Sequence, residues 1–198
     1  MKLSSAALAA ALAIVLAADW VAGCSSSPPT RFYTLSDAAS EASAPQGVGL
    51  VEVTGVSIPG ELDRPEVVRR MGANQLSISG LDRWAAPLDQ VIRRVLSDDI
   101  ARRVPAPVPG REYPVSVDIQ EFYGDEFCNV TLRAAWTVRQ PHAAAVQPAS
   151  EDIHVPSSGA CPVTLAATMS VAVGQLSDRI IAGVARMPAP AQPAQPAP

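Results

Sequence analysis

Two neighbouring segments in the middle of the chain alternate strictly between apolar and polar side chains. The apolar positions of the first are Tyr113, Val115, Val117 and Ile119, and those of the second are Cys128, Val130, Leu132, Ala134, Trp136 and Val138. A period of two puts alternate side chains on opposite faces of a β-strand, so each segment has one face to bury. A turn at 122–126 joins the segments into a predicted antiparallel hairpin, in which Cys128 faces the core.

Two other segments have the helical spacing that can cover such an apolar face. The first helix is predicted to begin at Pro87, because a proline at the first helical position loses no hydrogen bond. Its apolar stripe consists of Leu88, Val91, Ile92, Val95, Leu96 and Ile100. The second helix, predicted over about 163–187, has a stripe of Leu165, Met169, Val173, Leu176, Ile180 and Val184. Residues three or four apart share one side of a helix, so each stripe can be buried against the sheet.

Shorter segments add strands to the prediction. Residues 48–58 are rich in β-branched side chains and are predicted to form a strand. The apolar island at 31–35 is predicted to be a short strand that docks a polar tether onto the domain. Residues 67–78 predict a hairpin, and a helix over 65–71 is the competing interpretation.

The remaining segments are predicted to be mainly loops. Residues 105–110 are predicted to be a rigid, proline-rich loop and residues 141–149 a loose loop, with a short strand at 153–155. The whole pattern predicts an α+β fold, in which two amphipathic helices pack on one face of a mainly antiparallel β-sheet in a single domain.

The first 24 residues have the parts of a bacterial lipoprotein signal peptide. Lys2 is followed by an apolar run at 6–18, and the run leads to the sequence VAGC, which ends at Cys24 and has the pattern of a lipobox. The run is shorter than the ~20 residues of a transmembrane helix. We expect residues 1–23 to be cleaved as a signal peptide and Cys24 to be acylated with chains such as palmitate. An uncleaved N-terminal anchor is the alternative.

Residues 24–47 are predicted to be the acylated N-terminus and its tether, because Ser, Ala and Pro prevail on both sides of the apolar island. The extended chain from Cys24 to Phe32 reaches at most about 27 Å, which holds the domain close to the membrane. Ser25 resembles the sorting signal for an outer-membrane anchor on the periplasmic face, with the inner membrane as the alternative. Residues 188–198 predict a disordered Pro/Ala-rich tail.

The chain has three cysteines. If Cys24 carries lipid, Cys128 and Cys161 remain as a pair in an oxidising compartment, where a disulfide is the natural hypothesis. Two buried free thiols that pack as small apolar side chains are the alternative.

Charge and motifs give little support to nucleic-acid binding or catalysis. The formal net charge of −4 argues against a nucleic-acid partner, which favours a basic surface. The sequence has no GxSxG, Walker or HExxH motif, and His142 and His154 belong to no ligand-spaced cluster. We therefore predict no catalytic, metal or cofactor site, and no enzymatic activity.

Three residues of the middle region have two interpretations each. Asp63 and Arg64 are either a binding pair or a salt bridge that stabilises a turn. Trp84 is either a contact for a partner protein or a hydrophobic staple at the start of the first helix.

Several short motifs together resemble one known family. They are Cys24 followed by 31–35, then Leu62-Asp63-Arg64-Pro65, Asn74, Trp84-Ala85-Ala86-Pro87-Leu88, Phe122 and Trp136. In this combination the chain is similar to the ABC-type transport auxiliary lipoproteins, the PqiC-like family. The resemblance covers about residues 24–187, and we assign the family domain to 31–187.

The resemblance implies a function that residue patterns alone do not. It implies a non-enzymatic lipoprotein subunit of a trans-envelope ABC/MCE-type lipid transport system, which anchors or docks the periplasmic MCE component at the outer membrane. The implied partners are an MCE-domain protein and the ABC permease and ATPase, and members of the family can form homo-oligomeric rings. The alternative is a free-standing envelope lipoprotein that binds a small ligand or supports cell-envelope structure.

Replacing Cys24 with alanine tests the membrane anchor. We expect Cys24→Ala to release or mislocalise the domain and to leave its fold intact, because only the acylation site is lost. Membrane fractionation and the circular dichroism of the purified domain are the measurements. Continued fractionation of the variant with the outer membrane, with activity retained, would contradict the anchor.

Overall fold

The computed structural model describes residues 27–38, 44–45, 47–139, 146–161 and 163–187. Arg31 begins the compact unit of the chain, and 27–30 are exposed residues of a separate N-terminal unit. The predicted signal peptide, Cys24, His142 and the tail at 188–198 lie outside the described residues.

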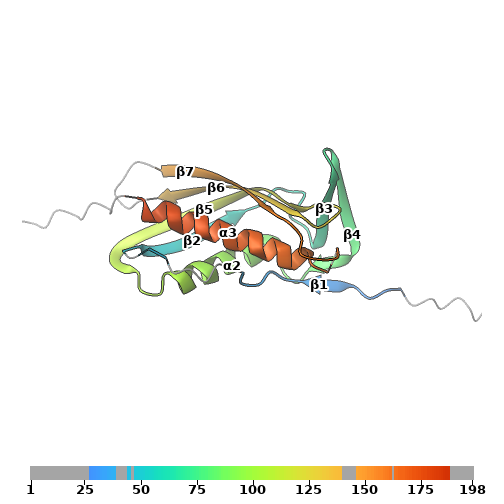
Figure 1. Ribbon diagram of the computed structural model, residues 1–198, viewed down its shortest axis with the longest axis horizontal. Helices are drawn as coiled ribbons and strands as arrows, with labels where there is room; N and C mark the ends of the chain where they lie inside the picture. The colour runs from blue at the N-terminus through green and yellow to red at the C-terminus, as the bar shows by residue number, and fades with distance from the viewer. Residues whose placement is uncertain (1–26, 39–43, 46, 140–145, 162, 188–198) are drawn as a thin grey trace, which may run out of the picture. The chain divides into compact units, whose positions relative to one another are not determined.

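The strands and helices of the described residues follow in a fixed order (Figure 1). They are β1 (Arg31–Tyr33), β2 (Gly49–Ser57), β3 (Glu66–Gly72), β4 (Gln75–Trp84), α2 (Leu88–Arg103), β5 (Val108–Gly124), β6 (Val130–Arg139), β7 (Val146–Val155) and α3 (Leu165–Ala185).

One mixed sheet contains all of these strands, and the long strand β5 is its centre. β2 pairs with β5 in parallel along one edge, and β6 pairs with β5 antiparallel along the other, followed by β7. The antiparallel pair of β3 and β4 joins β5 at a single position, where Arg69 lies opposite Gly124. β1 then pairs in parallel with the far edge of β4.

Both helices cover the same face of the sheet (Figure 1). α2 packs on β2 and on α3, and α3 packs on β5, β6 and β7. Every residue of the two predicted stripes is buried, as are the inward-facing residues of β5 and β6. The predicted α+β class is therefore confirmed. The sheet was predicted to be mainly antiparallel, and it also contains the parallel pairs β1–β4, β2–β5 and β3–β5.

A close approach between α3 and β6 explains a glycine inside a helix. A Cβ added to Gly183 would overlap the ring of Trp136, which is 3% exposed. Glycine costs about 1 kcal/mol relative to alanine in a helix interior. The contact with the tryptophan ring offsets this cost, because it brings the helix backbone directly onto the sheet.

A buried arginine joins the two helices by polar contacts. Arg103 at the end of α2 is 7% exposed and forms an ion pair with Asp178 and a hydrogen bond with Ser177, both on α3. A buried charge requires such partners, so this arginine constrains how the ends of the helices meet.

The hairpin predicted at 67–78 is confirmed as β3 and β4, and the competing helix over 65–71 is wrong. Pro87 was predicted to be the first residue of the helix. It is instead the N-cap, and α2 begins at Leu88. The Pro87 carbonyl accepts the N–H of Val91 at 3.1 Å.

Two strands are longer than their sequences indicate. β5 includes 108–110, which we predicted to be loop, because this stretch pairs with the start of β2. β7 begins at Val146 rather than near 153, although Pro148 interrupts its pattern. Proline is tolerated on an edge strand, where one side of the backbone has no partner to lose.

Because one side of α3 is buried, truncation of a side chain on that side should lower the free energy of unfolding much more than truncation on the exposed side. Leu176→Ala should lower the free energy of unfolding by about 2–5 kcal/mol, because the side chain is fully buried and its removal leaves a cavity. Gln175→Ala on the exposed side of the same helix should change it by less than about 0.5 kcal/mol. Urea unfolding of both variants measures the difference, and equal effects would contradict the assigned helix orientation.

Candidate functional site

The candidate functional site is the place where the N-terminal segment docks onto the domain. In β1, Arg31 lies opposite Asp82 of β4, and its Nε donates to Oδ1 of that carboxylate at 2.6 Å. The Tyr33 carbonyl accepts the N–H of Ala85 at 2.8 Å. The short strand is thus held by both its backbone and a charge-assisted hydrogen bond.

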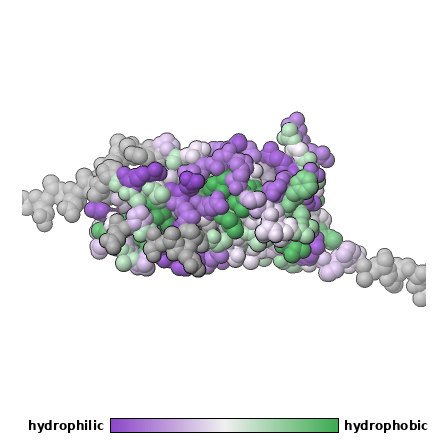
Figure 2. Space-filling view, viewed as in Figure 1, coloured by the Kyte–Doolittle hydropathy of each residue, from purple (hydrophilic) through white to green (hydrophobic). Residues whose placement is uncertain are grey.

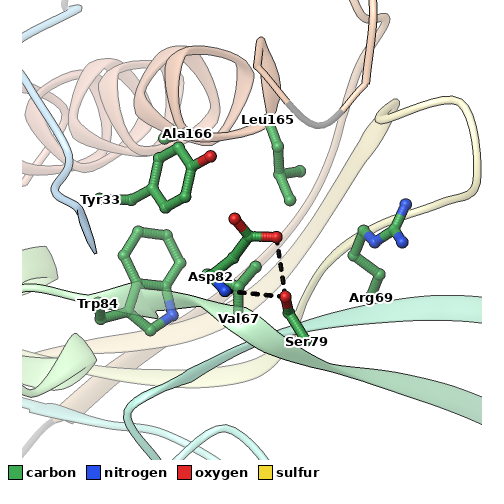
Figure 3. Close-up of a pocket in the computed structure, with 8 residues that line it drawn as sticks. All are labelled: Tyr33, Val67, Arg69, Ser79, Asp82, Trp84, Leu165 and Ala166. Carbon is green, nitrogen blue, oxygen red and sulfur yellow. Dashed lines mark hydrogen bonds between the residues drawn. The ribbon is translucent and has the colours of Figure 1, made fainter. Parts of the chain in front are cut away.

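Asp82 is the polar centre of this site (Figure 3). It is 9% exposed, and its second carboxylate oxygen accepts the Ser79 hydroxyl at 2.8 Å. The Ser79 oxygen in turn accepts the Asp82 N–H at 2.9 Å. Burial acts to raise the pKa of Asp82, but the hydrogen bonds from Arg31 and Ser79 and the charge of Arg31 outweigh it, so the pKa is lowered.

The chain after β1 continues the docking along both helices. Arg94 of α2 donates to the Leu35 carbonyl at 3.4 Å, and the Leu35 side chain is 1% exposed. The Ser36 N–H donates to the Ser170 hydroxyl of α3 at 3.1 Å. Asp37 pairs with Arg102 of α2 at 3.1 Å. The segment 31–37 therefore binds β4, α2 and α3 in succession.

A small cleft lies beside Asp82 (Figure 3). Its lining residues are Tyr33, Val67, Arg69, Ser79, Asp82, Trp84, Leu165 and Ala166. Tyr33 and Leu165 face Asp82 from the side of α3, and Trp84 lies next to Tyr33 (Figure 3). The free space of about 10 Å³ is about that of one water molecule, so the cleft is a packed junction and too small for a lipid.

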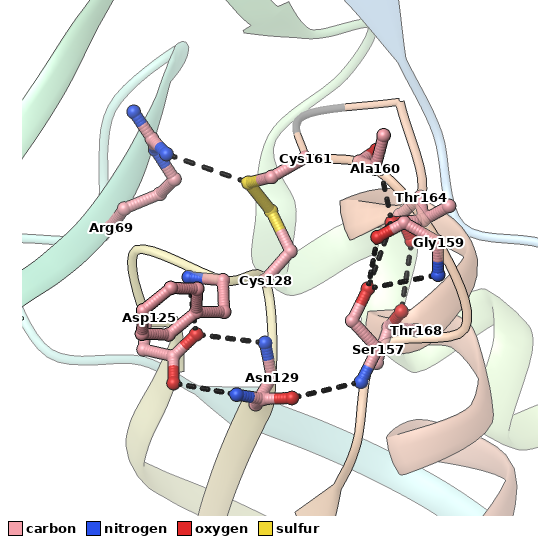
Figure 4. Close-up of a disulfide and its surroundings, with 11 residues drawn as sticks. Arg69, Asp125, Cys128, Asn129, Ser157, Gly159, Ala160, Cys161, Thr164 and Thr168 are labelled. Atoms are coloured by element: carbon pink, nitrogen blue, oxygen red, sulfur yellow. Dashed lines mark hydrogen bonds between the residues drawn. A yellow bond between two sulfur atoms is a disulfide. The ribbon is translucent and has the colours of Figure 1, made fainter.

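A disulfide lies close to one wall of this junction (Figure 4). Cys128 follows β5 and Cys161 precedes α3, and their sulfur atoms are joined, with the Cα atoms 5.5 Å apart. Arg69 donates from Nη1 to the sulfur of Cys161 at 3.5 Å. The bridge ties the loop before α3 to the turn between β5 and β6, and so helps to position Leu165 of the cleft.

The turn at Cys128 is fixed by a carboxylate as well. Asp125 Oδ1 accepts the N–H groups of Phe127 at 2.8 Å and Asn129 at 2.9 Å. The Asn129 side chain accepts the N–H of Ser157 at 3.0 Å, which reaches across to the loop before α3. Cys128 has φ 63°, a conformation that costs energy for a residue with a Cβ, and these contacts hold it there.

The sequence of the domain matches a family model. The model for the ABC-type transport auxiliary lipoprotein component matches residues 33–181, from the docked segment into α3.

The chain belongs to the ABC-type transport auxiliary lipoprotein family.

Two curated relatives are similar to this auxiliary lipoprotein. They are the intermembrane transport lipoproteins PqiC of Escherichia coli strain K12 and of Shigella flexneri. Each is 27% identical over 132 residues, which cover 62% of this chain and 71% of the relative.

Two crystal structures share the fold. An uncharacterized protein is 19% identical with a TM-score of 0.66, and the match covers 79% of this chain and 99% of that one. A Xanthomonas campestris protein is 17% identical with a TM-score of 0.60, covering 77% of this chain and 92% of that one.

Asp63, Arg64 and Trp84 each had two interpretations from the sequence, and their positions in the structure distinguish between them. Asp63 is exposed, and Arg64 pairs with Glu66 at 3.6 Å rather than with Asp63. Trp84 is 5% exposed, and its N–H on the backbone donates to the Pro65 carbonyl at 2.7 Å. The tryptophan is therefore part of the core at the docking site, and its ring is not available to a partner protein.

The other motif residues of the family are structural in position. Leu88, Phe122 and Trp136 are at most 3% exposed, and Pro87 is exposed at the start of α2. Pro87 and Leu88 lie at the start of α2, and Phe122 and Trp136 lie on the sheet. Leu88, Phe122 and Trp136 do not line the cleft at Asp82.

Sequence reasoning missed the residues that hold the docked segment. Asp82, Ser79, Arg94 and Ser170 lie far from Arg31 along the chain, and none is part of a recognisable motif. The available signal was weak: the predicted strand at 31–35 begins with an arginine, which needs a partner if the strand is to dock.

The described residues contain neither a membrane-spanning helix nor a cluster of metal ligands. Neither α2 nor α3 is long and apolar enough to span a membrane. In the same part of the chain no three His, Cys, Asp or Glu residues are grouped as metal ligands would be. His154 lies near Asp152, with Nε2 at 3.1 Å from the carboxylate, and near Thr131 on the next strand.

Replacing Asp82 with asparagine should loosen the docked segment. We expect β1 to open about 5–30-fold more often, because the charge-assisted hydrogen bond is lost from a mostly buried position. Hydrogen exchange of the Ala85 amide, which donates to β1, measures this opening. Asp98→Asn removes the same charge from an exposed site on α2 and should leave the exchange unchanged.

The lowered pKa of Asp82 also predicts how the docking of β1 depends on pH. The ionised carboxylate stabilises docking fully above its unfolded-state pKa of about 3.9, and this contribution is lost as the pH falls through the lower folded-state pKa. The Ala85 amide resonance should therefore report release of β1 only below about pH 4. Release in the neutral range would contradict the assignment.

Proposed function

We propose that this auxiliary lipoprotein is a non-enzymatic subunit of a trans-envelope ABC/MCE-type lipid transport system. In this role its acylated Cys24 anchors the domain at the outer membrane, facing the periplasm, and the domain docks the periplasmic MCE component. The inner membrane is the alternative site of the anchor.

The family membership is the observation that carries this proposal. The family model covers residues 33–181 and describes an auxiliary component of ABC-type transport. The similar PqiC proteins are named as intermembrane transport lipoproteins. In the proposed role the acyl anchor holds the domain at the membrane, and the domain contacts a protein partner.

The docked segment supports the anchoring part of the proposal. Residues 31–37 are bound to β4, α2 and α3. The free tether between the lipid and the domain is therefore limited to the residues before Arg31. Fully extended, 24–31 spans at most about 24 Å. A transport partner that contacts this domain must therefore come close to the anchoring membrane.

The packing at Asp82 supports a contact role over a small-ligand role at that site. The cleft has room for about one water molecule, and its polar groups are already paired. A free-standing envelope lipoprotein with a ligand site elsewhere is the competing function.

Crosslinking in intact cells separates the two functions. The full-length, acylated protein is tagged at the C-terminus, crosslinked, captured and analysed by mass spectrometry. We expect an MCE-domain protein together with the permease or the ATPase. Cys24→Ala, captured in parallel at equal expression, should recover less of them, because the domain is no longer held at the membrane. Recovery of no transporter subunit with the acylated protein would favour the free-standing alternative.

A further inference from the structure

The β3–β4 hairpin projects from the body of the fold (Figures 1 and 2). Among the described residues, its only strand pairing on the β3 side is Arg69 opposite Gly124. On the other side, β1 pairs with 82–84 alone. In the described part of the chain, residues 75–81 of β4 therefore have a strand partner on one edge only.

The exposed part of this hairpin has an unusual composition. Residues 71–81 contain no charged side chain, although Arg70 and Asp82 flank them directly. Met71 and Leu76 are 39% exposed, and Ile78 is 51% exposed. Proteins normally protect a free strand edge with charges or proline, because an uncharged apolar edge promotes aggregation. An isolated two-stranded hairpin is also only marginally stable in water. These features indicate that something covers the hairpin.

The length of the chain between Cys24 and Arg31 indicates that a membrane surface can cover the hairpin. β1 runs parallel to β4, and Arg31 lies opposite Asp82. From Asp82 back to Gln75, β4 extends about 23 Å. The chain from Arg31 back to Cys24 has the same number of residues and reaches at most about 24 Å. A membrane that holds Cys24 is therefore within reach of the hairpin turn.

We propose that the hairpin tip, residues 71–78, contacts the phospholipid surface in which Cys24 is anchored. This inference rests on the acyl anchor of the proposed function. The free edge of β4 sets the depth of the contact, because unpaired backbone groups are not tolerated in the hydrocarbon core. Met71, Leu76 and Ile78 lie in the headgroup layer, where water and headgroups can bind the free edge. The contact gives the tethered domain a second attachment and so a defined orientation.

A fluorescent probe at the tip tests the contact. Leu76→Cys is labelled with nitrobenzoxadiazole in the full acylated protein and reconstituted into vesicles of phosphatidylethanolamine and phosphatidylglycerol. Leu50→Cys is the matched control: Leu50 is 46% exposed and pairs with Glu112, near the opposite end of β5 from Gly124. We expect a blue shift on vesicles, and quenching by headgroup spin labels, for the probe at 76 only. Unchanged circular dichroism shows that both variants fold.

The other outcomes overturn the proposal in distinguishable ways. If the protein floats with vesicles but the probe at 76 behaves like the probe at 50, the anchor stands and the hairpin contact is wrong. If the probe at 76 is already blue-shifted without vesicles and the shift grows with protein concentration, a second copy covers the hairpin. If the protein does not float, the acyl anchor fails and the hairpin contact fails with it.

Discussion

The apolar face shared by β5 and β6 is the constraint on which the rest of the structure depends. Its side chains are almost fully removed from water, because α3 packs on both strands and α2 packs beside α3 on the neighbouring strand β2. Burial of apolar area is the dominant favourable term in folding, so the two helices must lie on this one face. The contact of Trp136 with Gly183 shows how tightly α3 approaches the sheet.

The same arrangement creates the place where the N-terminal segment docks. Because α2 and α3 lie side by side on the sheet, Arg94, Arg102 and Ser170 are brought next to the segment that follows β1. A sheet with both helices on one face also leaves the far edge of β4 open to β1. The docking of β1 is thus a consequence of how the core is built.

Polar groups add specificity that the apolar core cannot supply. Asp82 is mostly buried and accepts hydrogen bonds from Arg31 and Ser79, so the observed register of β1 pairs its charge. Arg103 plays the comparable part between the helices. A buried group without its partner costs free energy, and this cost excludes arrangements that apolar packing alone would tolerate.

The sequence by itself determined both helices, the β5–β6 hairpin and the buried side of each, because a period of 3.6 or 2 reports locally which side chains face the core. The hairpin of β3 and β4 was also predictable, although a helix competed with it. Only the tertiary structure decided the parallel pairing of β1 and β2, the full length of β7 and the role of Asp82. Strand partners and polar pairs join residues far apart in the chain. Their choice depends on which surfaces remain after the core has formed, and no local pattern contains that information.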